Sequence, residues 1–255
     1  LGNIRDTGEV EAQVREIVQS FAPAHDLSRI AGAFDLIDRA FDGKLPGYQK
    51  LKTLYHNRSH ANEVVLCAAR MLHGLHLARQ GLDADHIDAT LIGALMHDVG
   101  YLMTDEEASG TGAQFTDTHV LRGVDFVRTH LSDLPPDVLE ATTKVILLTD
   151  HRKPSSWVRF DNRQQQRAAY ATATADVIGQ MANREYLDWA QSLGFIASAA
   201  PIVLELYSET LQRFRLAGQG LYDGPRPPDP VDRARLARYF DPLPFWYPPL
   251  EMQQT

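Results

Sequence analysis

The amino-acid sequence predicts an all-α protein, and three observations support this fold class. Apolar residues recur at intervals of three and four residues through most of the chain, which is the spacing of amphipathic helices. No stretch alternates between apolar and polar residues with the period of two that marks a half-buried strand. The sequence also has no internal repeat, no low-complexity block and no clear linker between two cores. We therefore expect a single helical domain over residues 1–255.

The composition limits the classes of function that the protein can have. The 255 residues are 44% hydrophobic, enough for a substantial core, and the formal net charge of −8 argues against binding to bulk nucleic acid. The single cysteine, Cys67, excludes an intrachain disulfide, and its apolar neighbours predict a buried, unreactive thiol. No apolar run reaches the ~20 residues that span a bilayer. We expect a cytoplasmic protein without a membrane partner, and whether a segment precedes Leu1 is left open.

Residues 1–49 are expected to form two N-terminal helices. Apolar residues follow helical spacing over residues 9–21 and again over residues 27–41. Residues 42–47 contain two glycines and a proline, so they predict a surface loop that ends the second helix.

The next two predicted helices lead to the ionisable residues of interest. Asn57 is expected to cap a long helix that ends at Gly81, because its amide oxygen can accept from the free N–H groups of the first turn. An apolar helix then leads to His97 and Asp98, and residues 104–114, which are polar and hold two glycines, predict a mobile loop beside the site. The apolar helix opens with acidic residues that suit the positive end of a helix dipole: Asp83, Asp85 and Asp88.

The rest of the chain predicts further helices and an extended tail. Proline-rich segments at 224–230 and 242–249 cannot form regular helices, so residues 191–255 are expected to combine C-terminal helices with a tail that lies along the body. The expected helices span residues 118–131, 135–151, 163–190, 201–216 and 231–240.

An apolar run that stops at an ionisable pair is the first indication of function. Burying His97 and Asp98 costs on the order of several kcal/mol unless a partner compensates their charge, and a divalent metal is a common partner. His60 at the start of a helix and Asp176 among small and apolar residues are the further ligand candidates. Imidazole and carboxylate ligands without cysteine predict a metal with open coordination positions, such as Zn, Mn, Mg, Co or Fe.

The order of these residues resembles the HD-domain superfamily of metal-dependent phosphohydrolases. Residues 55–60 read YHNRSH, which is similar to the YHNxxH signature of cyclic-nucleotide phosphodiesterases. The resemblance covers residues 50–190 and implies an HD-domain helical bundle as the core, with the terminal helices added to it. The superfamily's His, then His-Asp, then Asp are in this chain His60, His97-Asp98 and Asp176.

The resemblance also implies roles for individual residues. His60, His97, Asp98 and Asp176 would hold the first divalent ion, and Asp98 would take part in catalysis and bridge to a second ion. His56 would act as the general acid that protonates the leaving oxygen after attack by a metal-activated hydroxide. Other HD families, including HD-GYP proteins and diiron oxygenases, place ligands for a second metal at positions that correspond here to His119, Asp150 and His151.

We therefore predict an HD-family phosphohydrolase, either a phosphomonoesterase or a phosphodiesterase, that cleaves a small phosphorylated substrate of the nucleotide class. Arg122, one turn beyond His119, is a candidate to hold the substrate phosphate. The sequence departs from the phosphodiesterases at Gly100 and Tyr101, where their motif continues with Asp and His. Two alternatives remain open: an HD-fold diiron oxygenase, and a non-catalytic, metal-stabilised helical module for interaction. The sequence does not indicate the oligomeric state.

Overall fold

The computed structural model describes residues 5–107 and 110–182, and it confirms the all-α prediction. These residues contain α-helices and short 3-10 helices but no strand, apart from one isolated antiparallel bridge between Tyr48 and Thr104. The predicted C-terminal helices and tail lie outside the described residues. The α-helices are α1 Thr7–Phe21, α2 Ser28–Phe41, α3 Arg58–Leu77, α4 Ala84–Met96, α5 His119–His130, α6 Pro136–Leu148 and α7 Arg163–Ala182. The 3-10 helices are η1 Val99–Tyr101, η2 Ala113–Phe115 and η3 Ser155–Trp157.

Near the site, the start of α3 was predicted correctly and the end of α6 was not. Asn57 caps α3 as expected, since its side-chain oxygen accepts hydrogen bonds from the backbone N–H groups of Ser59 and His60. The prediction that the helix over 135–151 ends in Asp150-His151 was wrong. In the structure α6 ends at Leu148, and a turn follows.

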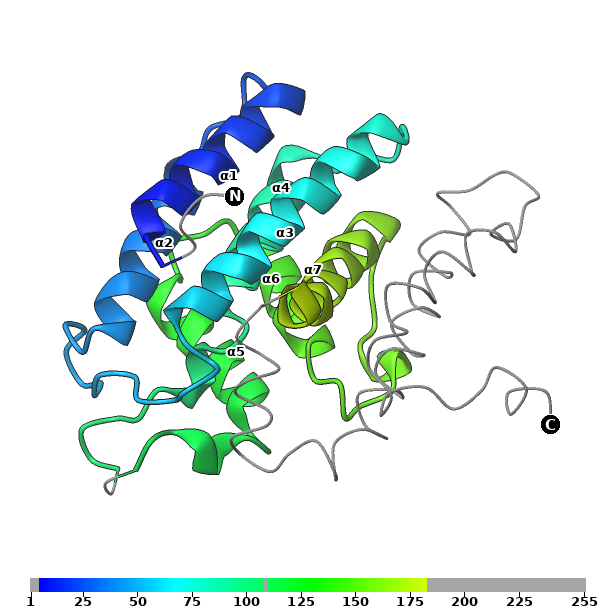
Figure 1. The fold of residues 1–255 in the computed structure, drawn as a ribbon. Helices are drawn as coiled ribbons and strands as arrows, with labels where there is room; N and C mark the ends of the chain where they lie inside the picture. The colour runs from blue at the N-terminus through cyan, green and yellow to red at the C-terminus, as the bar shows by residue number, and fades with distance from the viewer. Residues whose placement is uncertain (1–4, 108–109, 183–255) are drawn as a thin grey trace, which may run out of the picture.

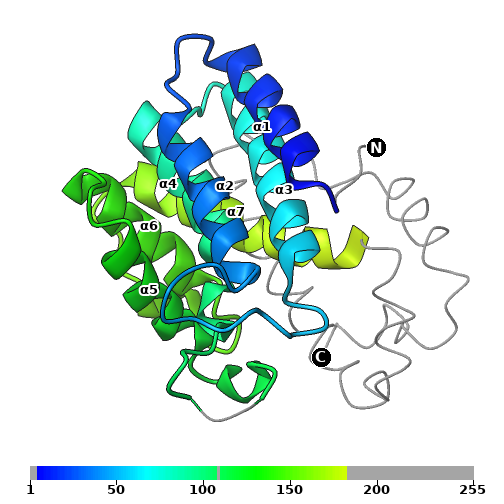
Figure 2. The same cartoon turned by 90° about the vertical axis from the view of Figure 1, so that its left-hand side faces the viewer.

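The apolar helix α4 lies at the centre of the bundle. Every residue from Ile87 to Met96 is buried, and α4 packs against α2, α3, α6 and α7. Figure 1 shows α3 between α1 and α7, and Figure 2 shows α5 and α6 side by side, away from α1. The last turn of α4 therefore delivers His97 and Asp98 to a point that α3, α5 and α7 also reach. None of the described helices combines the length and apolar content that a bilayer crossing requires.

Close packing of glycines brings the segments around the site together. A Cβ at Gly93 would lie 2.3 Å from the Val145 side chain, so α4 and α6 can approach this closely only because Gly93 has none. In the same way, η1 and α5 can approach closely only because Gly100 in η1 has no side chain. The predicted loop over residues 104–114 runs into η2, and directly before the loop the backbone N–H of Gln49 donates to the Met103 oxygen at 2.8 Å.

Candidate metal centre

Four side chains from α3, from α7 and from the two residues that follow α4 converge on one buried point, and we call them the four-donor cluster: His60, His97, Asp98 and Asp176. His60 Nε2 lies 3.3 Å from His97 Nε2, 3.5 Å from Asp98 Oδ2 and 3.1 Å from Asp176 Oδ1. His97 Nε2 lies 3.1 Å from Asp98 Oδ2 and 3.7 Å from Asp176 Oδ1. These residues are 116 positions apart at the extremes of the sequence, and the fold brings their ligand atoms together.

The spacing of the four donor atoms suits a bound cation. Ligand atoms held about 2.0 to 2.2 Å from a four- or six-coordinate ion lie about 3 to 3.6 Å from their neighbours. In the described residues, two overlapping groups of three side chains place ligand atoms within 4.8 Å of one another. One group is His56, His60 and Asp98, and the other is His60, His97 and Asp176. The side chains of this site could therefore hold a metal ion.

Local structure orients the imidazoles. His97 follows the last residue of α4, and its Nδ1 donates a hydrogen bond to the backbone oxygen of Ala94 at 2.8 Å. In the neutral ring this bond leaves the lone pair of Nε2 aimed at the cluster, as a metal ligand requires. His60 lies in the first turn of α3, whose start is fixed by the Asn57 cap.

Asp176 lies in the middle of α7, on a face of small residues. Ala173 and Ala175 are buried beside it, and small side chains allow α7 to pack closely against α3 and α4. An aspartate in such surroundings would be costly to bury without a partner, and here its carboxylate faces imidazoles.

Within the four-donor cluster, neighbouring charges shift the pKa values of His97, Asp98 and Asp176 towards the ionised form of each side chain. Burial alone would lower the pKa of His97, yet the adjacent Asp98 and Asp176 carboxylates raise it to about 9. Burial opposes ionisation of Asp98, but His56 and His97 hold its pKa well below the usual range. Burial likewise opposes ionisation of Asp176, whose pKa is lowered by His97, His151 and His60. Two ionised carboxylates beside imidazoles attract positive charge, either a proton or a metal cation.

His56 lies at the outer edge of the cluster. Its Nδ1 is 2.8 Å from Asp98 Oδ2, and its side chain is 37% exposed, so it contacts both the buried carboxylate and solvent. Burial lowers its pKa, but the Asp98 carboxylate more than offsets this and the net shift is upward. The His56 ring stacks on Tyr101 with centroids 4.5 Å apart, and Tyr101 also stacks on His119 at 4.4 Å.

The residues predicted for a second metal do not assemble as one group of three. His119 Nε2 lies 3.7 Å from Asp98 Oδ1, and His151 Nε2 lies 3.0 Å from Asp176 Oδ2. Asp150 instead binds Arg152, whose Nε donates to Asp150 Oδ1 at 3.0 Å. The two histidines thus approach the outer oxygens of the cluster carboxylates, while Asp150 has a cationic partner of its own.

His119 presents its lone pair towards the cluster in the same way as His97. Its Nδ1 donates to the backbone oxygen of Thr116 at 2.8 Å, which leaves Nε2 as the acceptor in the neutral ring. Burial lowers the pKa of His119, so the neutral, ligand-competent form is favoured.

The N–H groups of Arg122 bind oxygens of residues 100–107, so they are not free to bind a ligand. Its Nε donates to the Gly100 oxygen at 2.9 Å, its Nη2 to the Leu102 oxygen at 2.7 Å, and Nη1 to Glu107 Oε1 at 2.8 Å. The guanidinium also lies 3.7 Å over the Phe115 ring. With these contacts the paired N–H groups that a phosphate would need are already engaged, and the structure lends the predicted phosphate contact no support.

No role was predicted for three residues that contact the predicted site residues in the structure. Tyr101 stacks on two histidines, Arg152 joins Asp150 to Asp117, and Glu107 pairs with Arg122. A charged residue in a polar loop carries no signal that tells a solvated side chain from a paired one. The departure at Tyr101 from the phosphodiesterase motif was visible in the sequence, but its stacking partners were not.

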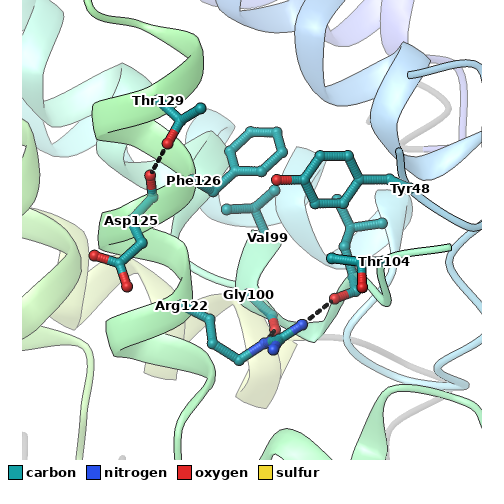
Figure 3. A pocket seen from close by; sticks show the side chains of 9 residues that line it. Tyr48, Val99, Gly100, Thr104, Arg122, Asp125, Phe126 and Thr129 are labelled. Carbon is teal, nitrogen blue, oxygen red and sulfur yellow. Dashed lines mark hydrogen bonds between the residues drawn. The ribbon is translucent and has the colours of Figure 1, made fainter. Parts of the chain in front are cut away.

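A separate pocket of about 200 Å³ lies beside η1 and α5 (Figure 3). Val99 and Gly100 line it directly after the His97-Asp98 pair, and Arg122 and Phe126 line it from α5. None of the cluster residues lines this pocket. Figure 3 shows the Asp125 carboxylate at the pocket, while its backbone oxygen accepts from the Thr129 hydroxyl.

The fold and the site together define an all-α protein with a buried histidine–carboxylate cluster that could hold a metal ion. No family model matches the sequence, and no solved structure matches it. The chain is similar to a protein of Allochromatium vinosum that is named as a subunit of sulfite dehydrogenase, with 56% identity over 73 residues. The matched segment covers 29% of this chain and 7% of the length of that relative.

This similarity contradicts the function predicted from the sequence. The relative is named as part of a dehydrogenase, which points away from a phosphohydrolase that acts on a nucleotide. The predictions of a hydrolase and of an HD-family phosphomonoesterase or phosphodiesterase are corrected accordingly. The physical reason for the error is that a histidine–carboxylate ligand set supports both Lewis-acid and redox chemistry, so the ligands alone do not select the reaction.

Proposed function

We propose that the four-donor cluster binds a redox-active transition metal and that this chain takes part in oxidation–reduction chemistry. The observation that carries the proposal is the convergence of two Nε2 and two carboxylate oxygen atoms at separations of 3.1 to 3.7 Å. The name of the partial relative, which belongs to a sulfite dehydrogenase, supports redox over hydrolytic use of such a centre.

The fit of a cation is supported by the two facing imidazoles. His60 Nε2 and His97 Nε2 are 3.3 Å apart, and the Nδ1 of His97 is already committed as a donor to Ala94. The lone pair of His97 Nε2 therefore needs a positive charge or a donor opposite it, which can be a cation between the rings, a protonated ring, or a neutral His60 that carries its proton on Nε2. A metal ion meets this need and also satisfies both carboxylates.

The donor set favours metals of intermediate softness. Imidazole and carboxylate ligands suit iron and manganese as well as zinc, whereas only the first two change oxidation state readily in proteins. We infer iron or manganese for the centre, held by His60, His97, Asp98 and Asp176. The metal would supply the capacity to take up and release single electrons.

The residues around the cluster would transfer protons to and from it and would limit the entry of water. His56 bridges the Asp98 carboxylate and solvent, so it is placed to carry a proton between the cluster and the exterior. Tyr101 is 2% exposed and packs against the His56 and His119 rings, which holds them in place and limits the entry of water.

A second ion belongs to the same proposal. The outer oxygens of Asp98 and Asp176 face His119 and His151, respectively, so each carboxylate has one oxygen for each ion. The order of ligands resembles that of HD-domain proteins, and we retain an HD-type arrangement of one or two ions as a proposal. A small anion such as sulfite is the substrate class that the name of the relative suggests.

The proposal is tested by loading the metal-free protein with Fe(II) under anaerobic conditions. We expect iron bound in stoichiometric amount, a reversible Fe(III)/Fe(II) transition in an EPR-monitored potentiometric titration, and transfer of electrons from sulfite to ferricyanide. His97→Ala should abolish all three properties. His76→Ala is the matched control, because His76 is exposed near the other end of α3.

Two results would contradict the proposal. One is a protein that binds only Zn and shows no reversible metal redox transition after iron loading. The other is metal-dependent release of phosphate from phosphate esters by wild type but not by His97→Ala. Redox activity without sulfite oxidation would retain the centre and reject only the substrate class.

A further inference from the structure

Arg122 on α5 binds the backbone on both sides of Tyr101. Its Nε donates to the Gly100 oxygen at 2.9 Å, and its Nη2 donates to the Leu102 oxygen at 2.7 Å. Figure 3 shows the Arg122 side chain reaching from α5 towards Gly100. Arginine suits this arrangement because its planar fork of N–H donors binds two acceptors at a fixed angle. One side chain therefore fixes the backbone directly before and directly after Tyr101.

The guanidinium of Arg122 is held in place by two further groups. Its Nη1 donates to Glu107 Oε1 at 2.8 Å, and its Nη2 donates to Glu107 Oε2 at 3.1 Å. Its Cζ also lies 3.7 Å from the centroid of the Phe115 ring, whose face attracts a cation. These contacts restrict the side chain to one orientation, in which its remaining N–H groups point to the two backbone oxygens.

The segment that Arg122 binds faces the pocket of about 200 Å³ beside η1 and α5. Val99, Gly100 and Leu102 line this pocket together with Arg122, and the pocket is large enough to admit water. On this side, hydrogen bonds rather than apolar packing hold the segment. Loss of the guanidinium would leave two carbonyl oxygens without their partner and would leave space into which Tyr101 and its neighbours can move.

The Tyr101 ring lies between two imidazoles that contact the four-donor cluster. Its centroid is 4.5 Å from that of His56 and 4.4 Å from that of His119, with interplanar angles of 23° and 14°. His56 Nδ1 lies 2.8 Å from Asp98 Oδ2, and His119 Nε2 lies 3.7 Å from Asp98 Oδ1. A shift of Tyr101 would therefore displace both imidazoles and open a path for water to the Asp98 carboxylate.

We propose that Arg122 is a positioning residue that holds Tyr101 between His56 and His119 and thereby limits the access of water to the metal centre. The placement of Tyr101 stands without the metal, whereas the effect on water at the metal rests on the proposed function. Arg122 acts through the backbone around Tyr101 and not on a ligand atom, so its loss should change access to the centre more than affinity for the ion.

The first test uses the full metal-free chain with ¹³C-labelled histidine. An aromatic ring shifts the NMR signals of the rings stacked on it, so the signals of His56 and His119 report the position of Tyr101. In Arg122→Gln we expect both signals to move towards their positions in Tyr101→Ala, which lacks the stacked ring. Arg128→Gln is the matched control, since Arg128 is an exposed arginine of the same helix. Unchanged signals of both histidines in Arg122→Gln would overturn the inference.

The second test measures how readily water reaches Mn(II) bound to the full chain, from the relaxation rate of the water protons. We expect Arg122→Gln to raise the relaxation enhancement about twofold, as one additional water on the ion would, and to weaken Mn(II) binding by less than about tenfold. Tyr101→Ala should give a similar rise. Adding Arg122→Gln to Tyr101→Ala should change nothing further, because Arg122 acts through Tyr101. Independent, additive effects of the two substitutions would overturn the inference.

Arg122→Lys separates the fork of donors from the positive charge. Lysine keeps the charge but lacks the planar fork, so both readouts should fall between those of wild type and Arg122→Gln. If Arg122→Gln does not fold, Arg122→Lys decides, because histidine signals and water relaxation equal to wild type in that variant would reject the inference. Wild type that binds no Mn(II) would contradict the metal centre and the effect on water, and the histidine signals would still decide the placement of Tyr101.

Discussion

Gly100 packs so closely against α5 that a Cβ on it would lie 1.8 Å from the backbone oxygen of His119. The same atom would lie 2.7 Å from the backbone nitrogen of Gly123. Since both contacts are to backbone, no side-chain rotation can relieve them. The glycine therefore sets the distance between η1, which follows the His97-Asp98 pair, and the helix that carries His119.

We predict that Gly100→Ala destabilises the protein by about 2 to 4 kcal/mol, because η1 and α5 must separate to make room. The separation should also displace His119 from Asp98. Chemical denaturation measures the change in the free energy of unfolding. Gly74→Ala is the control: apart from neighbouring residues and the backbone of α3 itself, no atom lies within 4 Å of a Cβ at this exposed position, so alanine should stabilise the helix by about 0.5 to 1 kcal/mol. Equal stability of Gly100→Ala and wild type would refute the packing argument.

The fold class followed from the sequence because helical periodicity is a local property. The buried run of α4 and the Asn57 cap of α3 depend on residues close in the chain, and both were predicted correctly. Cys67 was predicted to be buried and is only partly buried in the structure, where burial raises the pKa of its thiol to about 11. Local patterns of this kind can be read without knowledge of the tertiary structure.

Pairings between distant residues could not be predicted in the same way. Asp88 was assigned to the helix dipole, but it is buried and binds His25, 63 residues earlier. Asp150 was assigned to a metal, yet its partner is Arg152. The charge of a side chain is visible in the sequence, whereas the partner that compensates the charge depends on how the elements pack.

Removal of one cluster imidazole should abolish tight metal binding. We predict that His60→Ala weakens the first metal ion by more than about 100-fold, because it removes a ligand and leaves the remaining donors facing a gap. Isothermal titration with Mn(II) or Fe(II) measures the affinity, and circular dichroism checks that the helices remain. His76→Ala at the other end of α3 should bind metal as wild type does. Retention of wild-type affinity by His60→Ala would exclude the four-donor cluster as the site.

Stability of the metal-free protein should fall as the pH rises from 6.5 to 9. Asp98 and Asp176 raise the pKa of His97 to about 9, above the value near 6.5 in the unfolded chain. A raised folded-state pKa stabilises the protein fully below pH 6.5, and this contribution is lost as the pH passes through 9. The lowered pKa of His119 acts below pH 6.5, outside this range.

The expected loss is on the order of 1 to 3 kcal/mol in the free energy of unfolding, measured by urea denaturation at a series of pH values. The metal-saturated protein is the control. There the imidazoles are neutral ligands, and stability should hold or rise over the same pH range because protons no longer compete with the metal. A flat profile for the metal-free protein would show that His97 does not carry the extra proton.

The buried pair of His25 and Asp88 should stabilise the bundle without affecting the metal centre. His25 Nε2 is 2.8 Å from Asp88 Oδ1, and both side chains are almost fully buried between the segment before α2 and the first half of α4. Arg29 donates to the other Asp88 oxygen at 3.0 Å. We predict that Asp88→Ala costs about 2 to 4 kcal/mol, because it leaves a buried imidazole without its partner.

Asp85→Ala is the matched control for this pair. The Asp85 side chain is 53% exposed and meets Arg29 at 3.0 Å, so its loss should cost less than about 1 kcal/mol. Thermal and chemical denaturation measure both variants, and metal titration of the folded fraction should give wild-type affinity for each. If Asp88→Ala were as stable as Asp85→Ala, the buried pair would contribute nothing to α2–α4 packing. If Asp88→Ala lost metal affinity while folded, the pair would have to be coupled to the cluster at the far end of α4.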